Sequence, residues 1–140
     1  MVKRIEGGQL HTSRTLLAVK TVLEMTGAKR ILEIGFNTGD SAKAFLDAGA
    51  EYVHSVDIGE HPYIEECGNQ LKTIYDDQFD LTIKNSRDLT TDDIKDYDLI
   101  FIDGDHNRPD PDLQLAARAN IPWILFDDCH PKDRWWPQLF

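Results

Sequence analysis

The sequence predicts an α/β fold, a Rossmann-like, doubly wound and mainly parallel sheet of about five strands with flanking helices. Two observations favour it. Short apolar runs alternate with segments of helical periodicity along the 140 residues, which is the pattern of consecutive strand-helix-strand units. The first run also passes from Arg30 through a glycine-flanked turn directly into a helix at Ser41, as a buried parallel strand meets its crossover helix. The length fits a single domain over residues 1–140.

Hydrophobic spacing and turn residues place the elements in chain order. Leu16, Val19 and Leu23 recur at helical spacing before Gly27, so a helix is expected ahead of the first strand. The helices are expected at 13–25, from 41 to 46, over 64–74, briefly at 90–93 and at 113–119. The strands are expected at 30–34, 52–57, 81–83, 98–103 and 123–126.

The first turn excludes the common phosphate-binding loops. Gly35 and Gly39 are four residues apart, Asn37 occupies the middle glycine position of a dinucleotide fingerprint, and Asp40 the last. A phosphate there would meet a carboxylate, and the Gly-Lys-Ser/Thr ending of a nucleoside-triphosphate loop is absent from the turn. A nucleoside ligand without phosphate remains. The alternative is an ordinary strand-to-helix turn that needs two glycines for its geometry.

The stretch Glu33-Ile34-Gly35-x-x-x-Gly39-x-Ser41-Ala42 resembles motif I of the class I S-adenosylmethionine-dependent methyltransferases. It is most similar to the metal-dependent catechol O-methyltransferase type, which also lacks the middle glycine and keeps this serine. The resemblance extends over roughly residues 12 to 131. It implies S-adenosyl-L-methionine as cofactor, with contacts from Glu33, Gly35, Asn37, Gly39 and Ser41.

Two further strand ends carry candidate cofactor contacts. Asp57 ends the second expected strand about twenty residues past the turn, where doubly wound folds place the acid that binds ribose hydroxyls. The adjacent Ile58 is also expected to contact the cofactor. In the resembling family the end of the third strand often contacts adenine, which implies this role for Asn85 and Ser86. An acidic loop residue at position 57 and a plain turn at positions 85 and 86 are the alternatives.

Acidic side chains also end the fourth and fifth expected strands. Because parallel strands end at one edge of a sheet, the carboxylates at all these strand ends are expected to gather there. Like charges repel, so we expect them to hold a cation, either a sulfonium cofactor or a hard divalent ion such as Mg²⁺ or Ca²⁺. The resembling enzymes bind their ion with an aspartate after strand four and an acid-amide pair after strand five. This implies Asp103, Asp127 and Asp128 as metal ligands, with Asp128 replacing the amide.

Asp103 and His106 are the predicted catalytic residues. The resembling family often has a lysine three positions after the strand-four aspartate, and this chain has His106. An imidazole titrates near neutrality and suits proton removal from an acceptor hydroxyl, whose pKa a divalent ion would lower. The expected reaction is methyl transfer to an oxygen of a small molecule. A loop histidine hydrogen-bonded to Asp103 or Asp105 is the alternative.

Composition excludes several function classes. The formal charge of −10, without a basic run, argues against nucleic-acid partners, because such binding depends on phosphate neutralisation. No apolar stretch approaches the length of a membrane span and no signal pattern is present, so a cytoplasmic protein without membrane attachment is expected. Cys67 and Cys129 lack the spacing of a metal or redox pair.

The chain departs from the resembling family after residue 131, because it lacks the usual last two strands. An uncovered edge at the fifth strand would favour aggregation, so a homo-oligomer is expected. The same shortening keeps open a minimal S-adenosylmethionine- or nucleoside-binding module without transferase activity. An NAD-dependent oxidoreductase is a third interpretation, disfavoured by the missing G-x-G-x-x-G.

Overall fold

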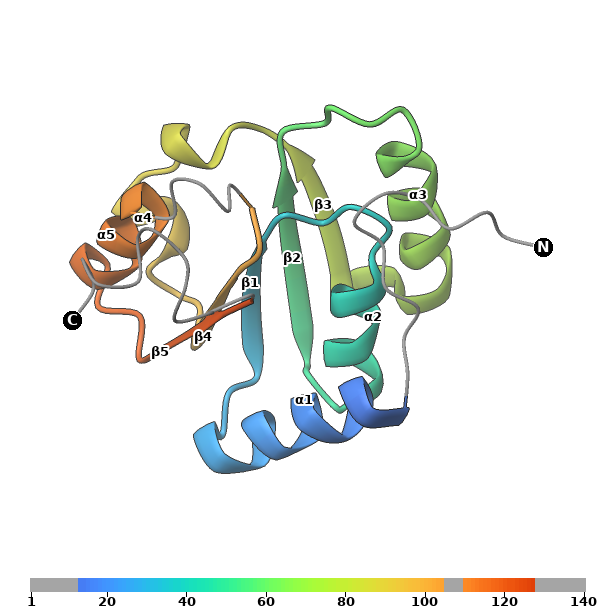
Figure 1. Ribbon diagram of the computed structural model, residues 1–140, viewed down its shortest axis with the longest axis horizontal. Coiled ribbons are helices and arrows are strands. Elements are labelled where there is room, and N and C mark those ends of the chain that lie inside the picture. Colours follow the sequence, from blue (N-terminus) through green and yellow to red (C-terminus); the bar gives the residue numbers. More distant parts are fainter. Residues whose placement is uncertain (1–12, 105–109, 128–140) are drawn as a thin grey trace, which may run out of the picture.

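The computed structural model describes residues 13–104 and 110–127. In these ranges five strands form one parallel sheet in the order β3-β2-β1-β4-β5, with helices on both faces (Figure 1). This confirms the predicted fold class. The strands are β1 (Arg30–Ile34), β2 (Tyr52–Asp57), β3 (Phe79–Ile83), β4 (Leu99–Ile102) and β5 (Trp123–Phe126). The α-helices are α1 (Ser13–Thr26), α2 (Asp40–Asp47), α3 (Ile64–Tyr75), α4 (Thr91–Ile94) and α5 (Asp110–Arg118), with 3-10 turns at Asp76–Gln78 and Ser86–Asp88.

The strand order places a switch point between β1 and β4. The chain leaves β1 toward β2 and β3 and later returns to the other side of β1 with β4 and β5. At such a point the crossover connections diverge, and open α/β sheets bind ligands beside the carboxyl ends of the strands there. A ligand-binding site is therefore expected at the edge of the sheet that follows Ile34, Asp57 and Ile102.

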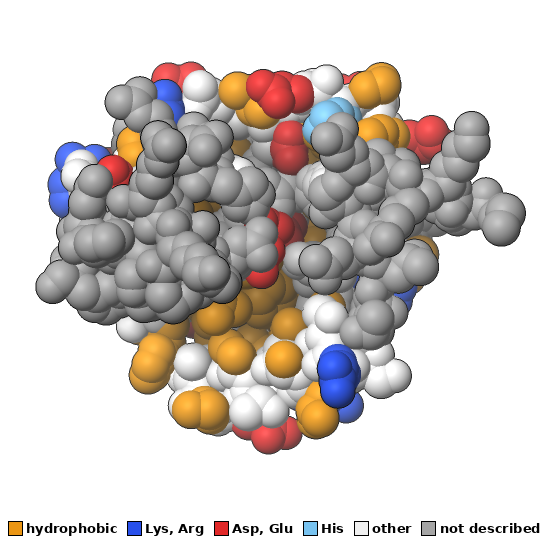
Figure 2. All heavy atoms as spheres, viewed as in Figure 1, with side chains coloured by type: hydrophobic (Ala, Val, Ile, Leu, Met, Phe, Trp, Pro, Cys, Tyr) orange, Lys and Arg blue, Asp and Glu red, His pale blue; other side chains and the backbone are white. Residues whose placement is uncertain are grey.

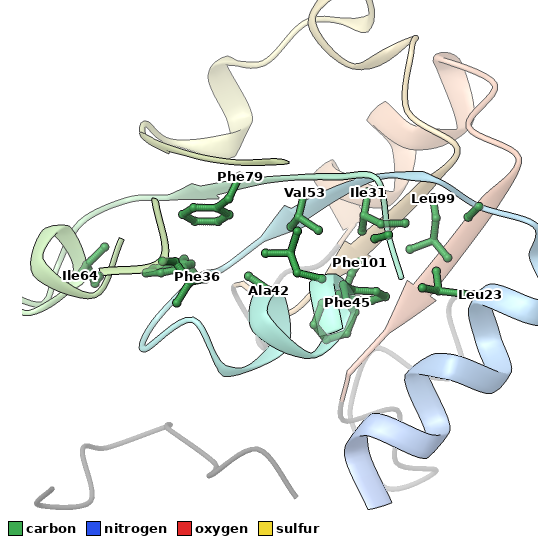
Figure 3. Close-up of a cluster of buried hydrophobic side chains, with 14 residues drawn as sticks. Leu23, Ile31, Phe36, Ala42, Phe45, Val53, Ile64, Phe79, Leu99 and Phe101 are labelled. Atoms are coloured by element: carbon green, nitrogen blue, oxygen red, sulfur yellow. The ribbon is translucent and has the colours of Figure 1, made fainter. Parts of the chain in front are cut away.

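One layer of the core lies between the sheet and helices α1, α2 and α3. Strand residues that alternate along β1, β2 and β4 point to this face, as the twofold period of a strand requires. Figure 3 shows them meeting aromatic and aliphatic side chains from the helices and from the turn after β1. The labelled members are Leu23, Ile31, Phe36, Ala42, Phe45, Val53, Ile64, Phe79, Leu99 and Phe101.

The third strand is longer than the sequence pattern predicts. It begins at Phe79 instead of Leu81, pairing Phe79 with Val53. The Phe79 side chain is fully buried and stacks on Phe36 with ring centroids 5.7 Å apart. A long-range contact with the turn after β1 therefore recruits this residue into the strand, and no local pattern signals it.

The opposite face of the sheet has a second apolar cluster under α4 and α5, which includes Leu32, Ile100 and Leu115. On the same face of the sheet, the side chains that pack over β2 and β3 are polar and aromatic. His54 hydrogen-bonds to the Tyr97 hydroxyl through Nδ1 and to Thr82 Oγ1 through Nε2, both at 2.7 Å. The imidazole thus joins two strands and the segment before β4.

His54 should make the fold less stable in mild acid. Burial lowers the pKa of His54 below its ordinary 6.5, although the Asp80 carboxylate acts in the opposite direction. The unfolded chain therefore binds a proton at His54 more readily than the folded chain, and stability is lost as the pH falls below about 6.5. Urea unfolding at pH 7.5 and pH 5 should show a larger loss for the wild type than for His54→Gln.

The exposed His61 provides the control for this measurement. His61→Gln should keep the wild-type difference between the two pH values, because the His61 ring stacks on Tyr63 at the surface with centroids 5.2 Å apart. An equal pH dependence for the wild type and His54→Gln would contradict the assignment to His54.

Two surface properties bear on earlier expectations. Every helix in the described ranges is too short or too polar to cross a lipid bilayer. Within the described sheet β5 pairs only with β4, and Trp123 at its start is 47% exposed. The homo-oligomer that would cover this edge stays a prediction.

Candidate functional site

Acidic residues from three neighbouring strand ends lie close together at the predicted edge. Asp57 ends β2, Asp103 follows β4, and Glu33 is the next-to-last residue of β1. Asp40 joins them from the first turn of α2. Figure 2 shows acidic side chains near the centre and along the upper rim of this view, and the arrow of β2 points toward this rim in Figure 1. The predicted gathering of carboxylates thus holds for Glu33, Asp57 and Asp103, and Asp40 is an addition that the sequence does not predict; the charges of all three aspartates act on Glu33.

Glu33 is the most unusual of these acids because it is completely buried. Its Oε2 accepts a hydrogen bond of 2.5 Å from Ser55 Oγ, whereas its Oε1 has no hydrogen-bond partner among residues 13–104 and 110–127. Burial raises the pKa of Glu33 well above 4.5; the Ser55 hydrogen bond lowers it, and the charges of Asp103, Asp57 and Asp40 raise it further. A buried carboxyl group with one unused oxygen among like charges is costly, and a cation bound beside it would relieve that cost.

Asp57 fastens the turn after β1 to the end of β2. Its Oδ2 accepts hydrogen bonds from the backbone N–H groups of Phe36 at 2.8 Å and Asn37 at 3.1 Å, and its Oδ1 accepts one from Gly59 at 2.8 Å. An ionised carboxylate has about four lone-pair positions. The three backbone donors leave one of them available to a ligand hydroxyl.

Gly35 is required by the close approach of β4 to the turn. Its φ is +96°, and a Cβ placed on it would lie 2.3 Å from the backbone oxygen of Asp103 and 3.0 Å from the Gly104 nitrogen. No side chain fits between these two chain segments. The glycine therefore brings the ends of β1 and β4 together at the site.

The other predicted turn residues shape the entry to α2. Asn37 has a φ of +51°, a conformation that asparagine tolerates better than most residues, and its Oδ1 accepts a 2.7 Å hydrogen bond from Tyr63 of the segment before α3. Gly39 is the N-cap of α2 with φ +85°. Ser41 lies half-buried in the first turn of this helix.

The predicted cofactor contacts Ile58, Asn85 and Ser86 follow the ends of β2 and β3. Ile58 is 55% exposed and Ile83 is 43% exposed, so two apolar side chains face solvent at adjacent strand ends. Asn85 is occupied as a helix cap, because its Oδ1 accepts a 3.0 Å hydrogen bond from the Arg87 N–H. Ser86 begins this 3-10 turn and is half-buried.

The predicted metal and catalytic residues are only partly within the described ranges. Asp103 is half-buried after β4, and Asp127 is exposed after β5, where its N–H donates a 3.2 Å hydrogen bond to the Ile102 carbonyl oxygen. His106 and Asp128 lie outside the described residues, as does Cys129. Across residues 13–104 and 110–127, no three His, Cys, Asp or Glu side chains are grouped so that they could hold a metal ion.

Sequence reasoning missed three residues around the site. Ser55 pairs in register with Glu33 across β1 and β2, and only this register makes a serine in an apolar strand noticeable. Asp40 accepts a 3.0 Å hydrogen bond from Thr38 Oγ1 and acts on Glu33 through its charge. Tyr63 holds Asn37, and no local signal connects these two residues.

Comparison with solved structures shows the same fold in known methyltransferases. The SAH-bound methyltransferase PaMTH1 of Podospora anserina superimposes with a TM-score of 0.68 at 20% identity, covering 91% of this chain and 63% of that protein. An O-methyltransferase from Bacillus cereus in complex with SAH gives a TM-score of 0.62 at 17% identity, covering 81% of this chain and 54% of that protein. The chain thus spans between 54% and 63% of the length of these two proteins.

The sequence itself matches a family model. A search of curated proteins finds no significant match. The model described as a methyltransferase domain matches residues 32–129, which include the β1 turn and the ends of β2, β4 and β5. Since this match covers more than half of the chain, the protein belongs to the methyltransferase-domain family.

Proposed function

We propose that this chain binds S-adenosylmethionine and transfers its methyl group to an oxygen atom of a small-molecule acceptor. The observation that carries the proposal is Glu33, whose buried Oε1 finds no hydrogen-bond partner in the described part of the chain and whose pKa is raised by the charges of Asp40, Asp57 and Asp103. A ligand with a positive charge and no phosphate suits this surrounding. S-adenosylmethionine carries its charge in the methionine portion and, when bound, supplies an electrophilic methyl group.

The residues at the strand ends fit the parts of this cofactor. Glu33 is placed to balance the positive charge, and Asp57 has one acceptor position left for a ribose hydroxyl. Ile58 and Ile83 offer exposed apolar surface suited to the adenine ring. Gly35, Asn37 and Gly39 of the turn after β1 and Ser41 of α2 are proposed to line the cofactor between its charged and ribose portions. Asn85 and Ser86 border the adenine region as further candidates.

The proposed mechanism also includes a divalent metal ion and a catalytic base. Asp103 and Asp127 directly follow paired residues of the adjacent strands β4 and β5, and neighbouring strands lie about 4.8 Å apart. With Asp128 they would offer hard oxygen ligands for Mg²⁺ or Ca²⁺. His106 is proposed to take the proton of the acceptor hydroxyl. The identities of the metal and the acceptor rest on the family resemblance.

Calorimetric titration tests the proposal directly. The chain should bind S-adenosylhomocysteine and S-adenosylmethionine but not NAD⁺, and formation of S-adenosylhomocysteine should be detectable with catechol-type acceptors. The titration is repeated with Mg²⁺ and with a chelator to test the metal. Failure to bind either adenosyl compound would overturn the assignment, whereas binding without turnover on any acceptor would reduce it to a binding module. Activity that the chelator leaves unchanged would remove the ion from the mechanism.

A further inference from the structure

We propose that Ser55 is a positioning residue for the cofactor's positive charge: its hydroxyl fixes the Glu33 carboxylate so that Oε1 is left to face the ligand. This inference rests on the proposed function and adds to it a residue that makes no cofactor contact of its own. The two side chains are both fully buried. They lie opposite one another in the register of β1 and β2, on the face of the sheet that α2 covers.

The hydrogen bond defines which oxygen is used within the protein. Ser55 Oγ donates to Glu33 Oε2 at 2.5 Å, and no other residue that the structure describes makes a hydrogen bond to Oε1. With one oxygen held, rotation of the carboxyl group would break a buried hydrogen bond, which is expensive in the protein interior. The hydrogen bond to Oε2 therefore also fixes the direction of Oε1.

The same hydrogen bond favours the ionised form of Glu33. A serine hydroxyl has a single proton, and donating it to Oε2 stabilises negative charge on the carboxylate. Among the described residues, the charges that act on Glu33 are those of acids: Asp40 of α2, Asp57 of β2 and Asp103 after β4. Burial and these acids raise the pKa of Glu33, and Ser55 lowers it. Ser55 thus opposes neutralisation of the group that meets the cation.

Removal of the hydroxyl should weaken cofactor binding in a pH-dependent way. Without Ser55, protonated Glu33 persists to higher pH, so Ser55→Ala should bind S-adenosylmethionine, which carries the sulfonium charge, about 10- to 100-fold more weakly at pH 7, the range for losing a hydrogen bond to a charged group. Affinity should recover as the pH rises. Glu33→Gln should bind weakly without this recovery.

Thr82→Ala is the matched control. It also removes a strand hydroxyl that makes a hydrogen bond, here of 2.7 Å to His54, but on the opposite face of the sheet. Affinity and its pH dependence should stay at wild-type values. If Ser55→Ala does not fold, Ser55→Thr and Ser55→Cys replace it. Threonine keeps the hydroxyl donor, whereas a thiol donates only weakly. The Ser55→Thr variant should therefore bind the cofactor more tightly than the Ser55→Cys variant.

The experiment combines calorimetric titration of S-adenosylmethionine between pH 6 and pH 9 with the ¹³C chemical shift of the Glu33 carboxyl carbon in the free protein. The titration midpoint of that carbon should move to higher pH in Ser55→Ala. If affinity, pH profile and midpoint are all unchanged in Ser55→Ala, the positioning role is wrong and the methyltransferase assignment stands. If the wild type binds neither adenosyl compound, the proposed function falls and takes this inference with it.

Discussion

Gly35→Ala should destabilise the fold by about 2–6 kcal/mol, which is a large part of the stability of an average domain. Two costs combine in this substitution. The backbone at Gly35 has a φ of +96°, which an L side chain rarely adopts, and the new methyl group would lie 2.3 Å from the Asp103 backbone oxygen. Because that neighbour is backbone within the centre of the sheet, relief requires β1 and β4 to separate at the site.

Gly49→Ala isolates the steric part of this effect. Gly49 has a similar φ of +107°, but nothing lies within 4 Å of the position of its Cβ. Its substitution should cost only the backbone strain, about 1–3 kcal/mol. Urea unfolding of both variants gives the difference. Equal losses would show that the contact between Gly35 and the end of β4 contributes nothing.

Asp57→Asn should both destabilise the chain by about 1–3 kcal/mol and remove most cofactor affinity. Each oxygen of the Asp57 carboxylate accepts at least one backbone N–H, from Phe36 and Asn37 on one side and from Gly59 on the other. An asparagine amide has one oxygen and one NH₂ group. In either orientation the NH₂ group would therefore face a backbone donor, and the turn would lose its attachment to β2.

Asp98→Asn provides the matched control for this substitution. Asp98 also binds two backbone N–H groups, those of Lys29 and Arg30 at 2.8 Å each, but both donate to the same oxygen. An asparagine can keep its oxygen there, so the loss should stay below about 1 kcal/mol and cofactor affinity should be unchanged. Unfolding curves and calorimetric titration with S-adenosylhomocysteine measure both effects. Equal losses of stability and of cofactor affinity in the two variants would contradict the conclusion that Asp57 holds the turn to β2.

The sequence predicts those parts of the fold that depend on local pattern. The apolar runs placed β1, β2, β4 and β5 within a residue or two, and the rule that parallel strands end together predicted that Glu33, Asp57 and Asp103 gather. The start of β3 was missed because Phe79 is held by Phe36, which is distant in sequence. A short-range pattern carries no information about such a contact.

The hydrogen-bonding roles within the site required the three-dimensional register. Ser55 is one small residue within β2, and only its pairing with Glu33 in the sheet shows that it acts at the site. Asp57 was predicted as a ribose contact from its spacing, yet three backbone amides of the protein also depend on it. Asn85 was predicted as an adenine contact, and the structure adds its role as a cap.

The bonds from Asp57 to the turn after β1 have a thermodynamic consequence for ligand capture. Donor and acceptor both belong to the protein, so these bonds preorganise the turn and an incoming molecule does not have to restrict its backbone. The entropic cost of association is correspondingly small. Recognition at this position should then be close to rigid docking, with little dependence of the association rate on loop motion.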